Sequence, residues 1–169
     1  TGNHVIRVGC FAGIIARQLG WPEDRVEMLV RAAQLHDVGK IGVPDDILFK
    51  PGKLEPQEFE MIKRHCSWGK QIIQPFSDHE LQMIKSHARV GEKILHVRHS
   101  PMMILAARIA QTHHENWDGS GYPLGLAGED IPLEGRITSV ADVYDALSSR
   151  RPYKEAFPRE KCFQILDEA

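Results

Sequence analysis

Cysteine is scarce in this sequence, and its few occurrences exclude one class of small protein. Only Cys10, Cys66 and Cys162 occur among 169 residues, and no two of them have the CxxC spacing. A sparse, odd-numbered set argues against a disulfide framework and against a zinc site built from thiolates. It favours reduced thiols in a cytosol, so we expect a cytoplasmic protein.

Long hydrophobic runs and a strong net charge are also missing. No apolar run approaches the ~20 residues that a membrane span needs, and no signal peptide is visible. The formal net charge is -2, which predicts no general affinity for nucleic-acid polymers. No stretch alternates between apolar and polar residues for long enough to indicate a β-strand.

The remaining composition is that of one globular domain. The sequence is 42% hydrophobic and 26% charged, and its length allows a sizeable core. Apolar residues recur with helical spacing in residues 1–19, 26–35, 58–72, 80–94 and 100–114, and again after Pro132 and Pro158. We therefore predict an all-α fold of about seven or eight helices over residues 1–169. The abrupt start of the first helix leads us to expect an upstream regulatory domain in a longer protein.

An imidazole and a carboxylate stand side by side in residues 35–42, LHDVGKIG. Gly39 and Gly42 end the helix that is predicted from residue 26 onward. His36 and Asp37 are therefore predicted to lie in the last turn of this helix. Neighbouring helix positions point about 100° apart. One metal ion would not easily take both side chains, whereas a carboxylate that bridges two ions, with the imidazole on one of them, fits. Taken alone, the pair is better explained as a buried histidine and a helix-end aspartate.

An internal repeat lies between residues 58 and 94. Residues 58–72, EFEMIKRHCSWGKQI, return 22 positions later as residues 80–94, ELQMIKSHARVGEKI, with seven identical positions. His65 and His87 occupy the same place in the two copies. Two units are too few for a solenoid, so we interpret the repeat as a local duplication that added one helix.

Several histidines and aspartates stand at the ends of apolar helices, where they could share a metal site. Asp142 lies in an apolar run, and a buried acid is costly unless it is paired or bound to a metal. Each candidate alone is compatible with a core or surface role. Together, imidazoles with bridging carboxylates suit Fe, Mn, Zn, Ni or Co rather than Ca or Mg. Two ions sharing Asp37 would hold a hydroxide and polarise phosphoryl oxygens for in-line displacement. The candidate ligands are His4, His36, Asp37, His65 or His87, His113, His114 and Asp142.

Five stretches of the sequence closely resemble the HD-GYP family, and together they span nearly the whole chain. They are residues 36–45, 50–54, 113–123, 140–147 and 151–154. The HD-GYP domains are cyclic di-GMP phosphodiesterases of bacterial signalling and a branch of the HD phosphohydrolase superfamily. The resemblance implies an all-α HD fold and a dinuclear iron or manganese centre. It also implies hydrolysis of cyclic di-GMP to linear pGpG, to GMP, or to both.

The resemblance also assigns roles to individual residues. The family's metal ligands fall on the candidate set above, and Asp37, His36 and Lys40 fall on its catalytic positions. Arginine offers a planar fork and lysine a point charge to a nucleotide, although both could also belong to a solvated helix end. The substrate-side positions are Lys40, Tyr122, Asp145, Arg151 and Lys154, and the family's naming motif is Gly121, Tyr122 and Pro123.

Three departures from the family pattern leave alternatives open. Some members have a glutamate ligand four residues before the first histidine, which would precede Thr1, so the centre holds two or three ions. Asn116 stands where an arginine is common. The family has one helix where this chain has the repeat. The family's spacing counted forward from Asp37 places the ligand histidine at His65, and the spacing counted back from His113 places it at His87. We favour His65, because the loop at residues 50–54 leads into its helix.

Two other classes of function stay open. One is an HD-type hydrolase of another cyclic dinucleotide. The other is a non-catalytic sensor that binds cyclic di-GMP and signals to a protein partner through the Gly121-Tyr122-Pro123 loop. The intact ligand set argues against the sensor, because a binding protein need not hold a metal-activated hydroxide. A dimer is compatible with each of these readings.

Overall fold

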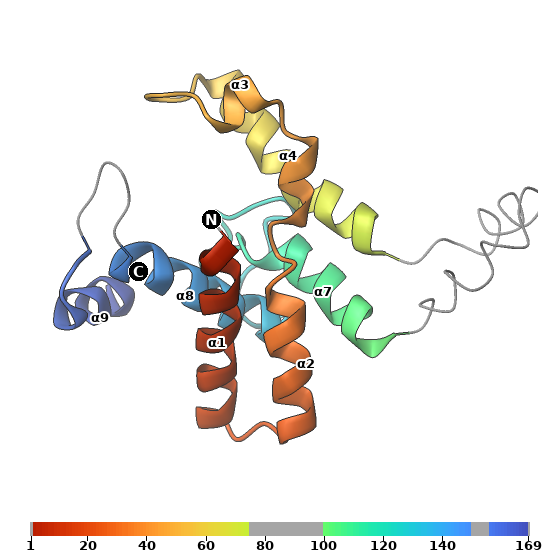
Figure 1. Ribbon diagram of the computed structural model, residues 1–169, viewed down its shortest axis with the longest axis vertical. Helices are drawn as coiled ribbons and strands as arrows, with labels where there is room; N and C mark the ends of the chain where they lie inside the picture. Colours follow the sequence, from red (N-terminus) through yellow and green to blue (C-terminus); the bar gives the residue numbers. More distant parts are fainter. Residues whose placement is uncertain (1, 75–99, 150–155, 169) are drawn as a thin grey trace, which may run out of the picture.

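The computed structural model describes residues 2–74, 100–149 and 156–168. These residues form seven α-helices and two short 3-10 helices, with no strand among them. The predicted all-α class is therefore confirmed (Figure 1). His87, Arg151 and Lys154 lie outside the described residues. No helix in the described segments is both long and apolar enough to cross a membrane.

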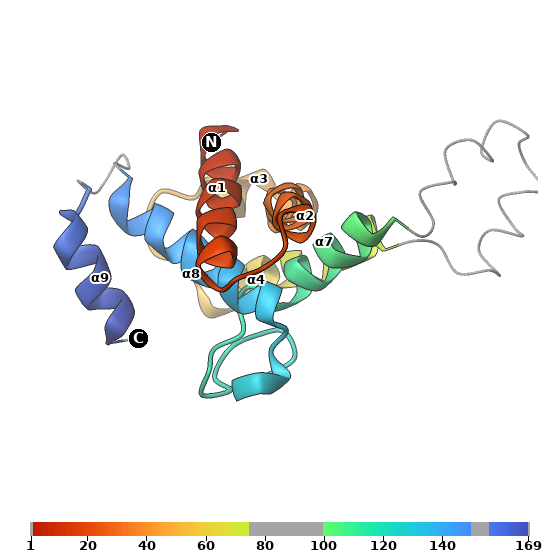
Figure 2. The same cartoon turned by 90° about the horizontal axis from the view of Figure 1, so that it is seen from below.

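The first two helices form an antiparallel pair. Helix α1 (Gly2–Gln18) and helix α2 (Glu23–Ala33) lie side by side in Figures 1 and 2 and pack on each other. The turn between them contains Gly20, whose φ of 76° suits a residue without a Cβ. Glu23 and Asp24 occupy the first turn of α2, where negative charge stabilises the helix dipole.

The second half of the chain crosses this pair. The 3-10 helix η1 (Val38–Gly42) and the short helix α3 (Asp45–Leu48) lead to helix α4 (Pro56–Ile73). Helix α7 (Pro101–Thr112) packs on α2 and α4, and helix α8 (Leu133–Ser148) packs on α1 and α7. Between them, η3 (Gly128–Asp130) follows a loop of residues 113–127, here named the Gly-Tyr-Pro loop. Helix α9 (Arg159–Asp167) contacts α8.

Small side chains fill much of the core between these helices. Alanines at positions 12, 32, 106, 110 and 141 are fully buried, and small contact residues allow helix axes to approach closely. The larger fully buried apolar residues of this core are Val8, Val26, Leu29 and Ile109. The predicted apolar stripes of α1, α2 and α7 therefore face one another.

The end of α2 differs from the sequence prediction. The α-helix ends at Ala33, so the prediction that His36 and Asp37 lie in its last turn is wrong. The chain instead winds more tightly, and the His36 amide donates to the Ala33 carbonyl, three residues back, at 3.2 Å. Gly39 permits this path, because a Cβ there would meet the His65 carbonyl oxygen at 1.8 Å. Only a residue without a side chain lets η1 lie directly on α4.

We expect Gly39→Ala to destabilise the fold, because the added Cβ would push η1 off α4. The free energy of unfolding should fall by about 1–3 kcal/mol, the usual cost of overpacking, in chemical denaturation followed by circular dichroism. Gly69→Ala is the matched control across the same contact, because its Cβ would meet nothing closer than 3.3 Å. Equal losses in the two variants would contradict the prediction.

Candidate metal centre

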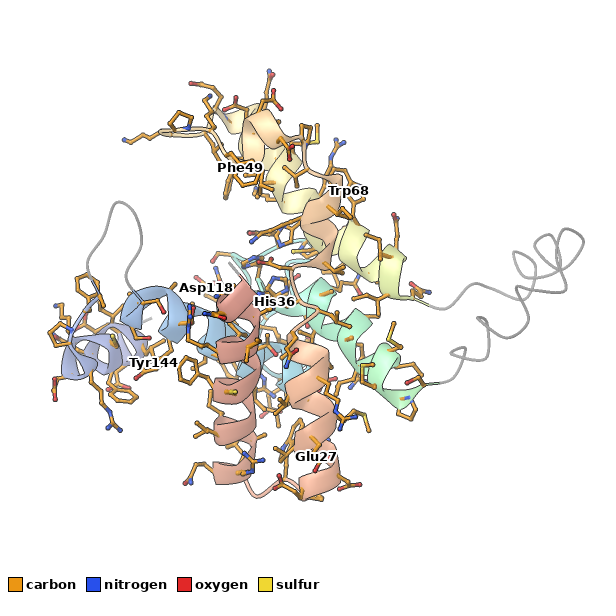
Figure 3. All side chains as sticks on the ribbon, viewed as in Figure 1. Glu27, His36, Phe49, Trp68, Asp118 and Tyr144 are labelled. Atoms are coloured by element: carbon orange, nitrogen blue, oxygen red, sulfur yellow. The ribbon has the colours of Figure 1, made fainter. Side chains whose placement is uncertain are left out.

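Donors that are far apart in the sequence lie together where several helices end. Figure 3 shows His36 inside the bundle, near adjoining ends of α1 and α2. We call this set the donor cluster: His4 of α1, His36 and Asp37 after α2, His65 and Cys66 of α4, His113 and His114 after α7, and Asp142 of α8.

The donor cluster consists of three overlapping groups, and the donor atoms within each group lie within 4.8 Å of one another. One group is His36, Asp37 and His113, and it shares one histidine with each of the other two. Because neighbouring groups share a histidine, the donors form one continuous set. Such a set suits two metal ions that lie close together better than two ions that lie far apart. The other groups are His4, His36 and Asp142, and His65, Cys66, His113 and His114.

The Asp37 carboxylate occupies the centre of the cluster. Its Oδ1 lies 3.3 Å from Nε2 of His65 and 3.8 Å from Nε2 of His113. Its Oδ2 lies 3.4 Å from Nε2 of His36 and accepts a hydrogen bond from Lys40. Imidazoles from three different segments thus surround a single carboxylate.

The backbone determines which nitrogen of these imidazoles carries the proton. In His36, His65 and His113, Nδ1–H donates to the carbonyl oxygen three residues earlier, at 2.7, 2.7 and 3.1 Å respectively. A carbonyl oxygen only accepts, so Nδ1 is protonated and Nε2 holds the lone pair of the ring whenever the ring is neutral. Metal-binding histidines are oriented in this way by the bond on their other nitrogen.

The resulting geometry fits bound cations. Nε2 of His36, Nε2 of His113 and Oδ1 of Asp37 are buried and have no hydrogen-bond partner within the described segments. Lone pairs of neutral imidazoles and of a carboxylate repel one another, and buried acceptors without partners are costly. A divalent ion between them would satisfy both, and nitrogen with oxygen donors suits a transition metal.

The pKa shifts of Asp37, His113 and His114 agree with this interpretation, whereas that of His36 runs against it. Burial raises the pKa of the Asp37 carboxyl group, but the surrounding imidazoles outweigh this effect and hold its pKa far below the usual range. Burial lowers the pKa of His113 and, with neighbouring histidines, lowers the pKa of His114 to about 2. Burial also lowers the pKa of His36, but Asp37 raises it further, and the net shift is upward. At neutral pH, Asp37 is charged while His113 and His114 are neutral, the states that bind metals.

A second carboxylate orients His4. The Nε2 of His4 lies 3.3 Å from Asp142, and its Nδ1–H donates to Asp145 at 2.8 Å. Asp145 is 1% exposed and also accepts hydrogen bonds from Arg7 and Ser149. We predicted that Asp145 contacts the substrate, but the structure places this residue behind His4, with both carboxylate oxygens engaged.

Lys40 and Tyr122, both predicted on the substrate side, border the cluster. Lys40 donates to Asp37, yet 38% of its side chain remains exposed. The Tyr122 ring lies 4.9 Å from that of His114 at an angle of 31°, and burial raises the pKa of its phenol. The sequence analysis missed Lys63, whose ammonium lies 5.7 Å from the centre of the Tyr122 ring. A partly open rim with two cations suits an anionic substrate.

A buried acid that the sequence analysis missed holds the Gly-Tyr-Pro loop. Glu115 is 4% exposed and accepts hydrogen bonds from the amides of Leu124 and Leu126 at 2.7 and 2.9 Å. The loop turns back so closely that a Cβ on Gly121 would meet the Asn116 nitrogen at 2.3 Å. In the sequence, the signal for this role was a single acid directly after His113 and His114. Through these hydrogen bonds, Glu115 ties the segment that carries Tyr122 to the end of α7.

The fold and the donor cluster together define a helical metal-binding domain of the HD class. The chain matches the model of the HD domain family over residues 74–169, more than half of its length, and therefore belongs to that family. Membership implies divalent metal binding, which the donor cluster fits.

Curated relatives confirm the predicted resemblance. The chain is 44% identical, over 99% of its length, to a cyclic di-GMP phosphodiesterase of Thermotoga maritima. It is 42% identical over 98% of its length to 3'3'-cGAMP-specific phosphodiesterase 2 of Vibrio cholerae. It is 43% identical over 98% to a cyclic di-GMP phosphodiesterase response regulator of Xanthomonas campestris. The chain spans 39%, 28% and 38% of the length of these three proteins.

We expect Glu115→Gln to loosen the Gly-Tyr-Pro loop, because an amide cannot accept from both backbone amides as a carboxylate does. Stability should fall by about 1–3 kcal/mol, the cost of leaving a buried donor unsatisfied, and the Leu124 and Leu126 amides should exchange hydrogen faster. Urea denaturation and hydrogen-exchange NMR measure the two effects. Glu129→Gln, at an exposed position after the same loop, is the control; the same loss there would contradict the assignment.

Proposed function

We propose that this domain is a metal-dependent phosphodiesterase that hydrolyses cyclic di-GMP to pGpG, to GMP, or to both. One observation carries the proposal: the Nε2 atoms of three imidazoles face the half-buried Asp37 carboxylate at 3.3–3.8 Å, while their Nδ1 atoms bond to backbone carbonyls. The relatives named as cyclic di-GMP phosphodiesterases support the substrate. The relatives are longer than this chain, so the activity is proposed for the domain.

The donor groups indicate at least two ions, with Asp37 between them. One ion would take His65, His113 and His114, and the other would take His4, His36 and Asp142. We propose iron or manganese, which accept nitrogen and oxygen ligands together. Bound ions would supply an activated water and would neutralise charge on the phosphoryl oxygens.

The chain's own residues prepare the substrate and the donors. Lys40 fixes Asp37 and presents its remaining exposed surface to an incoming phosphate. Tyr122 packs against His114 and shields that side of the cluster from water. Arg7 and Asp145 keep His4 in position, so we propose an orienting role for Asp145. Arg151 and Lys154, outside the described residues, remain our proposed contacts to the nucleotide.

A second candidate substrate is 3'3'-cGAMP. A relative with 42% identity is named as specific for that dinucleotide, and both molecules present two phosphodiester links to the same metal centre. Comparing turnover of the two substrates separates the candidates. Binding of cyclic di-GMP without metal-dependent hydrolysis would instead indicate the sensor.

Location and partners follow from smaller observations. The three cysteines are free, which suits the reducing cytoplasm that we propose. Trp117 and Leu124 of the Gly-Tyr-Pro loop are 60% and 53% exposed, and such side chains suit a protein contact. We therefore propose this loop as the surface for a signalling partner; the dimer remains a prediction.

We expect Asp37→Ala to reduce hydrolysis of cyclic di-GMP to background and to remove at least one ion, because it deletes the carboxylate shared by the two donor groups. Plasma mass spectrometry of anaerobically prepared protein gives the metal content, and chromatography identifies the products. Asp24→Ala, in the exposed first turn of α2, is the control. Normal turnover with a full metal complement in Asp37→Ala would contradict the central role of Asp37.

We expect Asp145→Asn to weaken one ion only, because the amide cannot satisfy both Arg7 and the His4 Nδ1–H. Losing such an orienting partner typically lowers metal affinity by about 10- to 100-fold. Calorimetric titration with Mn²⁺ should show one weakened site and one unchanged site. Asp130→Asn, at an exposed position in η3, is the control, and two unchanged sites would contradict the orienting role.

A further inference from the structure

One thiol lies within the donor cluster, although the sequence argued against a thiolate site. Cys66 follows His65 in α4, is fully buried, and places its Sγ 3.5 Å from the His65 Nε2. Its Sγ also lies within 4.8 Å of the donor nitrogens of His113 and His114. The other two cysteines are elsewhere: Cys10 is exposed on α1, and Cys162 of α9 donates to the Phe157 carbonyl.

A second observation, on His113, points to a ligand at this position. The Nε2 of His113 has no hydrogen-bond partner within the described segments, and the residue is 1% exposed. This nitrogen is aimed into the same space as the Cys66 sulfur. The Cys66 thiol makes its hydrogen bond to His65. It therefore does not satisfy the buried His113 Nε2, which still needs a partner.

The chemistry of the donors narrows the choice of ion. Three imidazoles and one sulfur form the donor set His65, Cys66, His113 and His114. Thiolate with imidazole suits Zn²⁺, Co²⁺ or Fe²⁺, whereas Mn²⁺ prefers oxygen ligands. A sulfur donor at this end of the cluster would therefore favour the more thiophilic ions over manganese.

We propose that Cys66 is a direct metal ligand in this protein, and that its sulfur selects a thiophilic divalent ion at the group formed with His65, His113 and His114. Ligation forms a metal–sulfur bond and releases the thiol proton to water, with no change in oxidation state. The inference rests on the proposed metal centre and goes beyond it, because it distinguishes the two ends of the cluster by their donor chemistry.

Cobalt spectroscopy tests the inference without using activity. Co²⁺ is titrated anaerobically into the metal-free protein and into the Cys66→Ser and Cys66→Ala variants. Wild-type protein should show the thiolate-to-cobalt charge-transfer band in the near ultraviolet together with the visible d–d bands. Both variants should lose the first band and keep the second. Their affinity for Co²⁺ should fall by about tenfold or more, as loss of even an indirect partner does, and their affinity for Mn²⁺ should fall less.

Cys10→Ser and Cys162→Ser are the controls, and both should keep the charge-transfer band. Visible cobalt bands without a charge-transfer band in wild-type protein would overturn the role of Cys66 and leave the proposed centre intact. A charge-transfer band that persists in Cys66→Ala would overturn it as well. Failure of wild-type protein to bind cobalt would overturn both the proposed centre and this inference. Circular dichroism verifies that each variant is folded. If a variant is not folded, the presence or absence of the charge-transfer band in the wild-type protein decides the inference.

Discussion

The rest of this structure depends on a half-buried carboxylate, Asp37, surrounded by imidazoles. The surrounding imidazoles hold the pKa of Asp37 far down, so the carboxylate is charged at neutral pH, and each of these imidazoles is fixed by a bond from its Nδ1–H to a backbone carbonyl. Without a cation, such an arrangement opposes folding. With a cation it becomes an anchor that joins α2, α4 and α7. Folding and metal binding are coupled in such sites, because the donors converge only in the folded chain.

The helix ends serve this arrangement in two ways. The last carbonyls of a helix have no partner within it, and those near the ends of α2 and α7 accept the Nδ1–H groups of His36 and His113. This bond turns the opposite nitrogen toward Asp37. The negative ends of the two helix dipoles also point at the cluster, which favours positive charge there. Backbone and side chains therefore prefer the same kind of ligand.

This chain differs from the family pattern at positions close to that centre. Asn116, where an arginine is common, is exposed and donates to Ser120 within the Gly-Tyr-Pro loop. Cys66 places a sulfur atom in one of the donor groups. The three imidazoles that face Asp37 come from other positions.

The sequence by itself determined the helices and the types of donor. Apolar periodicity is a local property, so it predicted α1, α4, α7 and α8, and the unusual acid in an apolar run identified Asp142. The position of Asp145 behind His4, the contacts of Glu115, the place of Cys66 beside His65 and the tight turn at His36 were decided only by tertiary structure. Each depends on contacts between segments that are distant in the chain, and local spacing carries no information about them. The turn at His36 illustrates the reason, because it exists only where Gly39 meets the backbone of α4.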